Sequence, residues 1–266
     1  MNTLILGCGP AGLIAAHAAT VAGSDIRILS KFQKSPLYGA QYLHEPIPLT
    51  PAAYLVGEQV AYTLEGDALS YRLKVYGDTW DGNVSPEDLD EDHLAWDLRG
   101  TYDWLWDYYK HTIIDFEVSP ILMPSLSSIA ETADLVVNAM PRPLLCAGGH
   151  TFASQDIWAA GDAPELGIKV PHTCPPMTVV CNGGEQSWYR KSNIFNRTTV
   201  EWSLNTIGDQ KPLPTASLVR KPLWHNCDCK HWDTPTIHVG RYGSWHKGVL
   251  SHESYRQVLD RIGAGF

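Results

Sequence analysis

A glycine-rich turn between an apolar run and an alanine-rich stretch stands at the start of the chain. Residues 4–16 read LILGCGPAGLIAA, with glycines at positions 7, 9 and 12. The pattern predicts a buried strand over residues 3–6, a helix over 11–21 and a second strand over 25–29. A strand, a glycine turn, a helix and a strand within about 30 residues form the βαβ unit that binds a dinucleotide.

Each residue of the turn has a mechanical role in such a unit. Gly7 makes the tight turn, Gly9 lets the backbone approach a pyrophosphate, and Gly12 lets the helix lie close to the strand. The amides at the helix N-terminus then face the phosphates. With Pro10 and Ala11 between the last two glycines, we expect residues 7 and 9–12 to line the phosphate site.

The motif Gly-x-Gly-Pro-Ala-Gly resembles that of the FAD-binding two-dinucleotide-fold flavoproteins more than that of the nicotinamide dehydrogenases. This resemblance implies FAD as the cofactor. It also implies that a later strand offers its backbone to the adenine, and Val118 in the stretch DFEV is the matching position.

The end of the second strand departs from that pattern. An acidic residue is expected there to hold the ribose hydroxyls, but Ser30 and Lys31 occupy the position. A serine can still bond a ribose hydroxyl. Serine followed by lysine also suits a 2′-phosphate, so NADP is the alternative cofactor.

The segment LYGAQYLHEPIP, residues 37–48, follows the second strand, where flavoproteins of this kind run a loop under the isoalloxazine ring. The resemblance implies that Gly39 and Ala40 bring backbone amides to the flavin N5 edge. Gln41, Tyr42 or His44 would bond the polar rim, and His44 is a catalytic candidate because a histidine can tune flavin protonation. A solvated loop histidine is the plainer interpretation.

The stretch IHVGRYGSWHKGVLSHESYRQVL, residues 237–259, resembles the closing segment of the UDP-galactopyranose mutase and amine-oxidase-like flavoproteins. There a strand ends in a Gly-Arg pair and the next helix points its N-terminus at the flavin side of FAD. The resemblance assigns Gly240 and Arg241 to the cofactor. In disulfide-reductase-type flavoproteins an Ala-x-Gly-Asp strand end serves instead, which makes Asp162 the competing anchor; we favour Arg241.

Arg190 is the second catalytic candidate. It lies in WYRKS, where its guanidinium could clamp an anionic group in a bidentate manner beside a stacking Trp188 or Tyr189. An exposed strand arginine is the alternative. The flanking stretches SWYRKSNIF and TTVEWS predict a hairpin that turns at Asn196 and Arg197.

Two cysteines and two histidines occur together in HNCDCKH, residues 225–231. Zinc accepts such atoms, but a Cys-x-Cys pair needs further ligands, for instance Cys174 or His172. We therefore favour a thiol pair at Cys227 and Cys229 and assign no metal site. Without a signal peptide, the six cysteines are expected to be reduced thiols.

The net charge of -9 disfavours nucleic acid as a partner. The sequence contains no run of about 18 apolar residues of the kind that spans a membrane. We expect a cytoplasmic protein that acts on a small-molecule or nucleotide-linked substrate. The sequence leaves the oligomeric state open.

The remaining patterns complete a fold prediction. Residues 85–113 predict a helix that opens at Ser85 and Pro86, while DIWAAGDAP and MTVVCNG predict strands. The predicted fold class is α/β, with a Rossmann-like FAD-binding domain and a small inserted helical and antiparallel-strand substrate region. The FAD-binding domain would comprise residues 1–50, 112–182 and 234–266, and the insertions residues 51–111 and 183–233.

These observations predict an FAD-dependent oxidoreductase that acts on a C–N or C–O bond of a small molecule or nucleoside. Three alternatives stay open. They are a mutase-like flavoenzyme without net redox, flavin-dependent tailoring of a modified nucleic-acid base, and a non-catalytic dinucleotide-binding protein.

Overall fold

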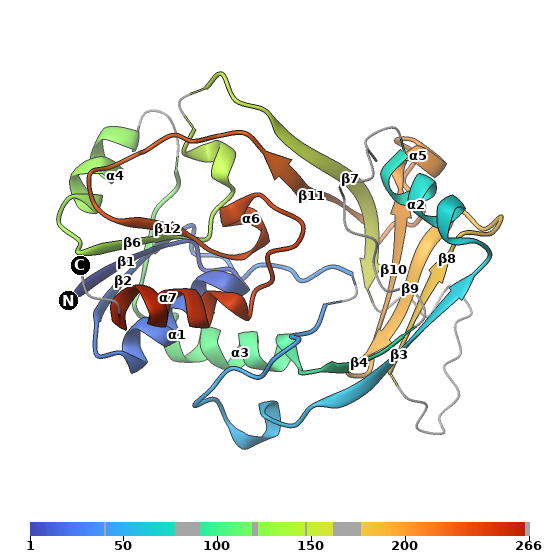
Figure 1. The fold of residues 1–266 in the computed structure, drawn as a ribbon, viewed down its shortest axis with the longest axis horizontal. Coiled ribbons are helices and arrows are strands. Elements are labelled where there is room, and N and C mark those ends of the chain that lie inside the picture. The colour runs from blue at the N-terminus through green and yellow to red at the C-terminus, as the bar shows by residue number, and fades with distance from the viewer. Residues whose placement is uncertain (40, 78–90, 119–121, 147, 162–176, 264–266) are drawn as a thin grey trace.

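The computed structural model describes residues 1–266 apart from 40, 78–90, 119–121, 147, 162–176 and 264–266. The described chain forms two β-sheets with helices on their faces (Figure 1). None of the helices in these ranges has the length and apolar character needed to cross a membrane.

The first sheet is parallel and contains the glycine turn. Its strands stand in the order β12-β6-β1-β2-β5; their bounds are β1 Asn2–Leu6, β2 Asp25–Ser30, β5 Ile113–Asp115, β6 Leu135–Asn138 and β12 Thr236–His238. Strand β1 is central, and Ile5 pairs with Ile28 on one side and Val137 on the other. Burial on both faces explains the continuous apolar runs of β1 and β6.

Helices cover both faces of this sheet. One core unites the sheet with α1 (Pro10–Val21), α3 (Leu98–Tyr109) and α7 (Glu253–Gly263). The alanines of α1 let these helices lie close together, because Ala15, Ala16, Ala18 and Ala19 are fully buried. Helix α4 (Met123–Ala130) covers the opposite face through a second core.

The second sheet has seven strands in the order β11-β7-β10-β9-β8-β3-β4. Their bounds are β3 Glu58–Glu65, β4 Asp92–Ala95, β7 Phe152–Gly161, β8 Met177–Asn182, β9 Trp188–Ile194, β10 Arg197–Ser203 and β11 Ser217–His225. Neighbours are antiparallel except β3 and β8. Helices α2 (Ala68–Tyr76) and α5 (Leu204–Ile207) lie against it (Figure 1).

The predicted hairpin is confirmed as β9 and β10, which pair from Arg197 and Ile194. Its turn lies one residue earlier than expected. Phe195 and Asn196 have φ values of 49° and 59°, as a two-residue turn with left-handed central residues requires.

The predicted helix over 85–113 is only partly correct. Asp92–Ala95 is strand β4, because it pairs with β3 in the second sheet. Helix α3 starts after Asp97, whose side chain accepts a hydrogen bond from the Gly100 amide at 2.9 Å, and it runs to Tyr109. Ser85 and Pro86 lie outside the described residues.

The assignment of strands and helices to the two sheets does not follow the predicted domain boundaries. Strands β7 and β8 fall within 112–182, yet both belong to the second sheet. Helix α3 falls within 51–111, yet its apolar stripe of Leu98, Tyr102, Leu105 and Tyr109 is buried in the core of the first sheet. Among the described elements, the chain passes between the sheets after β2, β4, β6 and β11.

Candidate functional site

The glycine turn lies at the carboxyl end of β1, at the centre of the parallel sheet. Gly7 has φ 100°, and its amide donates to the Leu29 carbonyl of β2 at 2.9 Å. A Cβ on Gly12 would lie 2.0 Å from the Gly7 carbonyl oxygen. These two positions therefore require glycine for the fold itself, Gly7 for its backbone conformation and Gly12 for the contact between helix and strand.

Gly9 is different. Its φ of -69° and ψ of 177° are ordinary extended values that any residue adopts. Among the residues that the structure describes, a Cβ built there would meet only Ser35 Oγ, at the van der Waals distance of 3.5 Å. Neither conformation nor protein packing demands a glycine, whereas a ligand that approaches the backbone does.

The N-terminus of α1 opens toward the same turn. Gly9 is its N-cap and offers no side-chain acceptor, Pro10 follows, and no acidic residue lies in the first turn. The first backbone bond of the helix runs from the Leu13 amide to the Gly9 carbonyl at 3.0 Å. The Ala11 and Gly12 amides precede it at the positive end of the helix dipole, where an anion is favoured.

The closing segment of the chain lies against this turn. Helix α6 (Gly240–Ser244) follows β12, and Gly240 has φ 65°. A Cβ on Gly240 would lie 2.3 Å from the Ala11 Cβ, and one on Gly243 would lie 2.2 Å from the Asn138 carbonyl oxygen of β6. Gly240 and Ala11 are thus brought together, as their assignment to one site requires.

Arg241 points elsewhere. Its Nε and Nη2 donate to the Pro222 carbonyl oxygen of β11 at 3.1 and 3.0 Å. The guanidinium thereby links α6 to the second sheet. Its predicted contact with the cofactor remains a proposal.

The residues after β2 border the glycine turn. Ser30 is the last residue of β2, and the Cys8 thiol donates to the Lys31 carbonyl at 3.7 Å. The exposed Lys31 side chain lies 4.0 Å from Glu117. Asp115 of β5 is the register partner of Ser30, and its carboxylate accepts from the Phe32 amide at 2.8 Å.

Sequence reasoning missed Asp115. Asp115 supplies a carboxylate next to the end of β2, which itself lacks one. The available signal was that Asp115 opens the predicted strand DFEV. Val118 follows β5, is partly buried and packs against the core that α4 covers.

The loop that follows leads to the second sheet. Gly39 has φ 86°, and a Cβ there would lie 2.4 Å from Glu201 Oε1 of β10. Gln41 turns back on its own loop, with Nε2 donating to the Tyr38 carbonyl at 2.8 Å. Gly39 thus approaches the second sheet at an acidic side chain.

Glu201 belongs to a buried charge cluster that we define as Arg190, Glu201 and Lys221. Glu201 is 1% exposed, lies 3.6 Å from Arg190 Nη1 and accepts a hydrogen bond from Lys221 Nζ. Arg190 also donates to the Tyr71 hydroxyl at 2.8 Å, so it is not the exposed strand arginine of the alternative interpretation.

Among the residues that the structure describes, Glu201 faces both Arg190 and Lys221 in this cluster. Burial lowers the pKa of Lys221; Glu201 opposes that shift, while the positive charges of Arg190 and Arg241 add to it. Sequence reasoning missed Glu201 and Lys221. The signal for Glu201 was a single acidic residue in the alternating stretch TTVEWS. Lys221 had no signal beyond its position in a strand.

His44 lies in a separate aromatic group. Its ring stacks on Tyr42 at 4.7 Å and lies 5.7 Å from the His252 ring. The Tyr42 hydroxyl is 3.0 Å from that of Tyr62 in β3. Partial burial, with smaller contributions from His252 and His93, lowers the pKa of His44 to about 4, so this imidazole is neutral near pH 7.

Several positions named from the sequence lie outside the described residues: Ala40, Asp162, His172 and Cys174. Two surface hollows lie apart from the glycine turn. One, of about 410 Å³, is lined by residues such as Trp188 and Lys191 of β9. The other, of about 520 Å³, lies between β12 and α7 at His238 and Arg261.

No protein-family model and no curated protein matches this sequence. Solved structures do match its fold. CtdE, in complex with FAD and substrate 4, superposes with a TM-score of 0.51 and 12% identity, over 98% of this chain and 80% of that chain. A thermophilic tryptophan halogenase from Streptomycin violaceusniger gives 0.50 and 14%, over 98% of this chain and 72% of that chain.

The peptidyl tryptophan dihydroxylase QhpG gives a TM-score of 0.49 and 13% identity, over 98% of this chain and 65% of that chain. The chain is thus about two thirds as long as QhpG. The likeness to CtdE and the halogenase shows the fold, which is Rossmann-like α/β with antiparallel strands, as predicted. The finer resemblance to the UDP-galactopyranose mutase group rests on the sequence alone.

Proposed function

We propose that the chain is an FAD-dependent oxidoreductase. The observation that carries the proposal is Gly9, whose glycine identity neither conformation nor protein packing explains. It stands beside the uncapped N-terminus of α1, so the turn offers both the space and the amides that a pyrophosphate needs. CtdE, a structure of the same fold, contains FAD.

The residues present fit this cofactor. The amides of α1 would hold the pyrophosphate, Ser30 or Asp115 the ribose, and the backbone after β5 near Val118 the adenine. When bound, FAD supplies two-electron redox chemistry at its ring, while the protein supplies binding, orientation and electrostatics.

We place the reacting part of the proposed site beside the buried charge cluster. Gly39 lies against Glu201, so the loop from the glycine turn ends beside Arg190 and Lys221. The Arg190 guanidinium would offer a bidentate contact to an anionic group on the flavin ring or on a small-molecule substrate. Arg190 is our candidate for that contact, with oxidation of a C–N or C–O bond as the reaction class.

NADP is the alternative cofactor, because Lys31 follows Ser30 at the ribose position. The test is the purified protein itself. Its absorption spectrum is recorded, and the molecule released on denaturation is identified by chromatography against FAD, FMN and NADP(H) standards. We expect a yellow protein that releases FAD. A colourless protein that FAD does not reconstitute, yet that binds NADPH, would overturn the proposal in favour of NADP.

A further inference from the structure

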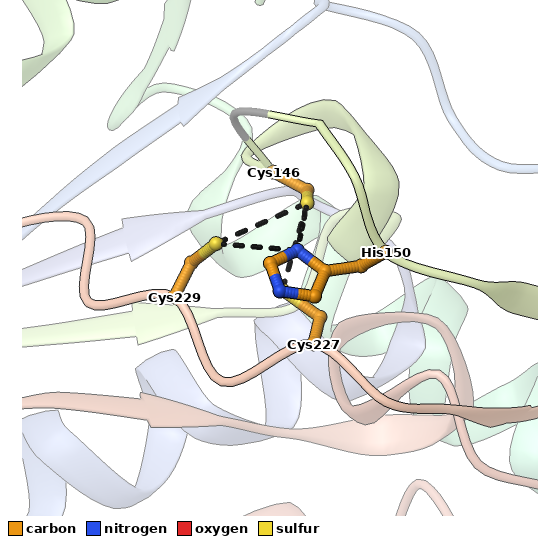
Figure 2. A group of neighbouring side chains, drawn as sticks. All are labelled: Cys146, His150, Cys227 and Cys229. Carbon is orange, nitrogen blue, oxygen red and sulfur yellow. Dashed lines mark hydrogen bonds between the residues drawn. The ribbon is translucent and has the colours of Figure 1, made fainter.

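Three cysteines and a histidine from two distant segments meet on one side of the molecule. Cys146 and His150 lie in the connection that leaves the first sheet after β6 and η4 (Arg142–Leu144) and enters β7. Cys227 and Cys229 lie in the connection that leaves β11 and returns to β12. The cluster therefore joins two of the chain's passages between the sheets, and Figure 2 shows the four side chains turned toward one another.

The distances between the ligand atoms are close to those of a tetrahedral coordination shell. The four ligand atoms lie within 4.8 Å of one another. Cys146 Sγ is 3.6 Å from Cys227 Sγ and 4.0 Å from Cys229 Sγ, and His150 Nδ1 is 3.2 Å from Cys146 Sγ and 3.5 Å from Cys229 Sγ. A tetrahedral zinc ion, with bonds of about 2.3 Å to sulfur and 2.0 Å to nitrogen, separates its ligands by roughly 3.5–3.8 Å.

The surroundings orient the donors. His150 Nε2 lies 3.3 Å from Asp228 Oδ1, so the proton belongs on Nε2 and the Nδ1 lone pair faces the sulfurs. Carboxylates hold metal-binding histidines in this way. The Gly148 amide donates to Cys146 Sγ at 3.5 Å, and reciprocal bonds between Thr151 and Asn226 hold the two segments together.

The histidines of HNCDCKH are used otherwise. His225 Nδ1 accepts from the Cys227 amide at 2.9 Å, and the His231 ring lies 5.7 Å from the Trp232 ring. The missing ligands come from Cys146 and His150, about 80 residues earlier in the chain. This distance is why spacing within one segment gave no metal signal.

We propose that Cys146, His150, Cys227 and Cys229 bind one zinc ion. Three thiolates and an imidazole form a closed soft-donor shell that suits a structural Zn²⁺ rather than a hard cation. Four protein ligands leave no open position for substrate, so the ion fastens the two connections instead of taking part in catalysis. The site is independent of the proposed flavin function.

The test is elemental analysis of the full-length protein purified without chelator. We expect about one zinc per chain, and its loss in Cys146→Ser and in Cys229→Ser. Cys181→Ala supplies the matched control, because Cys181 is buried in β8 away from the cluster, and it should retain zinc.

A second variant keeps all four zinc ligands, so it tests the site even if the cysteine variants fail to fold. Asp228→Asn changes an exposed side chain and should leave the fold intact while weakening zinc binding about 10–100-fold, measured by competition with a chromophoric chelator. Protein that arrives without metal and fails to bind added Zn²⁺ after thiol reduction would overturn the proposal. So would a disulfide within the cluster found in freshly purified protein by mass spectrometry, or another metal at full occupancy.

Discussion

Gly240 and Ala11 meet at the carboxyl end of the first sheet, although 229 positions separate them in the chain: a Cβ on Gly240 would lie 2.3 Å from the Ala11 Cβ. The contact fixes the closing segment on the start of α1. The contact and a φ of 65° both require glycine at position 240, so the fold depends on this residue, and the part of Gly240 in a cofactor site remains a proposal.

Gly240→Ala should therefore destabilise the protein. Overpacking costs about 1–3 kcal/mol, and the left-handed backbone adds about 1 kcal/mol. We expect a fall in Tm of roughly 5–10 °C by calorimetry, at about 2–4 °C per kcal/mol for a chain of this size. Gly263→Ala is the control and should keep the parent Tm, because a Cβ there meets none of the described residues within 4 Å. A Gly240→Ala protein as stable as the control would refute the contact.

Gly9→Ala should separate cofactor binding from folding. The added Cβ has room in the protein but would occupy the space of a pyrophosphate. We expect the parent circular dichroism spectrum and a Tm within about 2 °C of the apoprotein, with at least a tenfold loss of FAD affinity, or about 1.4 kcal/mol. The measurement is flavin fluorescence quenching at fixed salt.

The comparison variant is Gly12→Ala, whose Cβ would lie 2.0 Å from a carbonyl oxygen and should disrupt the fold itself. Parent FAD affinity in Gly9→Ala would remove the turn from the cofactor site.

The first βαβ unit was predictable because its signals are contiguous. The apolar run, the glycines and the alanines of residues 3–21 each point to the same local structure, and the structure contains β1, the turn and α1 there. The β9–β10 hairpin is predictable for the same reason, since alternation and turn lie side by side.

The distribution of strands between the sheets was not predictable, because pairing partners are distant in sequence. Strand β7 reads like any half-buried strand, but only β10 and β11 decide that it joins the second sheet. The acidic stretch that contains Asp92–Ala95 looks helical until β3 is available to pair with it. Side-chain clusters pose the same problem. Arg190 could be named as a candidate from its own stretch, but its partner Glu201 is recognised only once β9 and β10 are paired.

Arg241→Ala tests the role that the structure gives this guanidinium. Losing two hydrogen bonds from a charged group to the Pro222 carbonyl should cost about 1.5–3 kcal/mol in the free energy of unfolding, measured by urea denaturation. Arg220→Ala is the matched control, because the Arg220 side chain is 64% exposed and an ion pair of an exposed arginine is worth about 0.2–1 kcal/mol. Unchanged stability with a tenfold or greater loss of FAD affinity would instead assign Arg241 to the cofactor.

Glu201→Gln should be strongly destabilising. It removes the buried carboxylate that pairs with Arg190 and Lys221, at a cost of about 3–5 kcal/mol. Adding Lys221→Met should recover part of that loss, since it removes the buried cation whose carboxylate partner has been replaced. The exposed Glu58→Gln in β3 should change stability by less than about 0.5 kcal/mol. Equal free energies of unfolding for Glu201→Gln and Glu58→Gln would contradict the cluster's role.

His238 should make the protein sensitive to mild acid. Its Nδ1 lies 3.1 Å from Asn138 Nδ2, an amide donor, so the folded protein needs the neutral ring. Burial first, then the positive charge of Arg142 and the neighbouring His231 and His225, lower the pKa of His238 from 6.5 to about 3. Between these pH values the unfolded chain binds a proton that the folded chain does not, so the stability is fully present above pH 6.5 and is lost as the pH falls toward 3.

At about 1.4 kcal/mol per pH unit, the parent should lose about 2 kcal/mol more than His238→Gln between pH 6.5 and 5 in urea titrations. Above pH 7 the difference between the two proteins should stop changing with pH, and parallel curves throughout would show that His238 does not carry the effect.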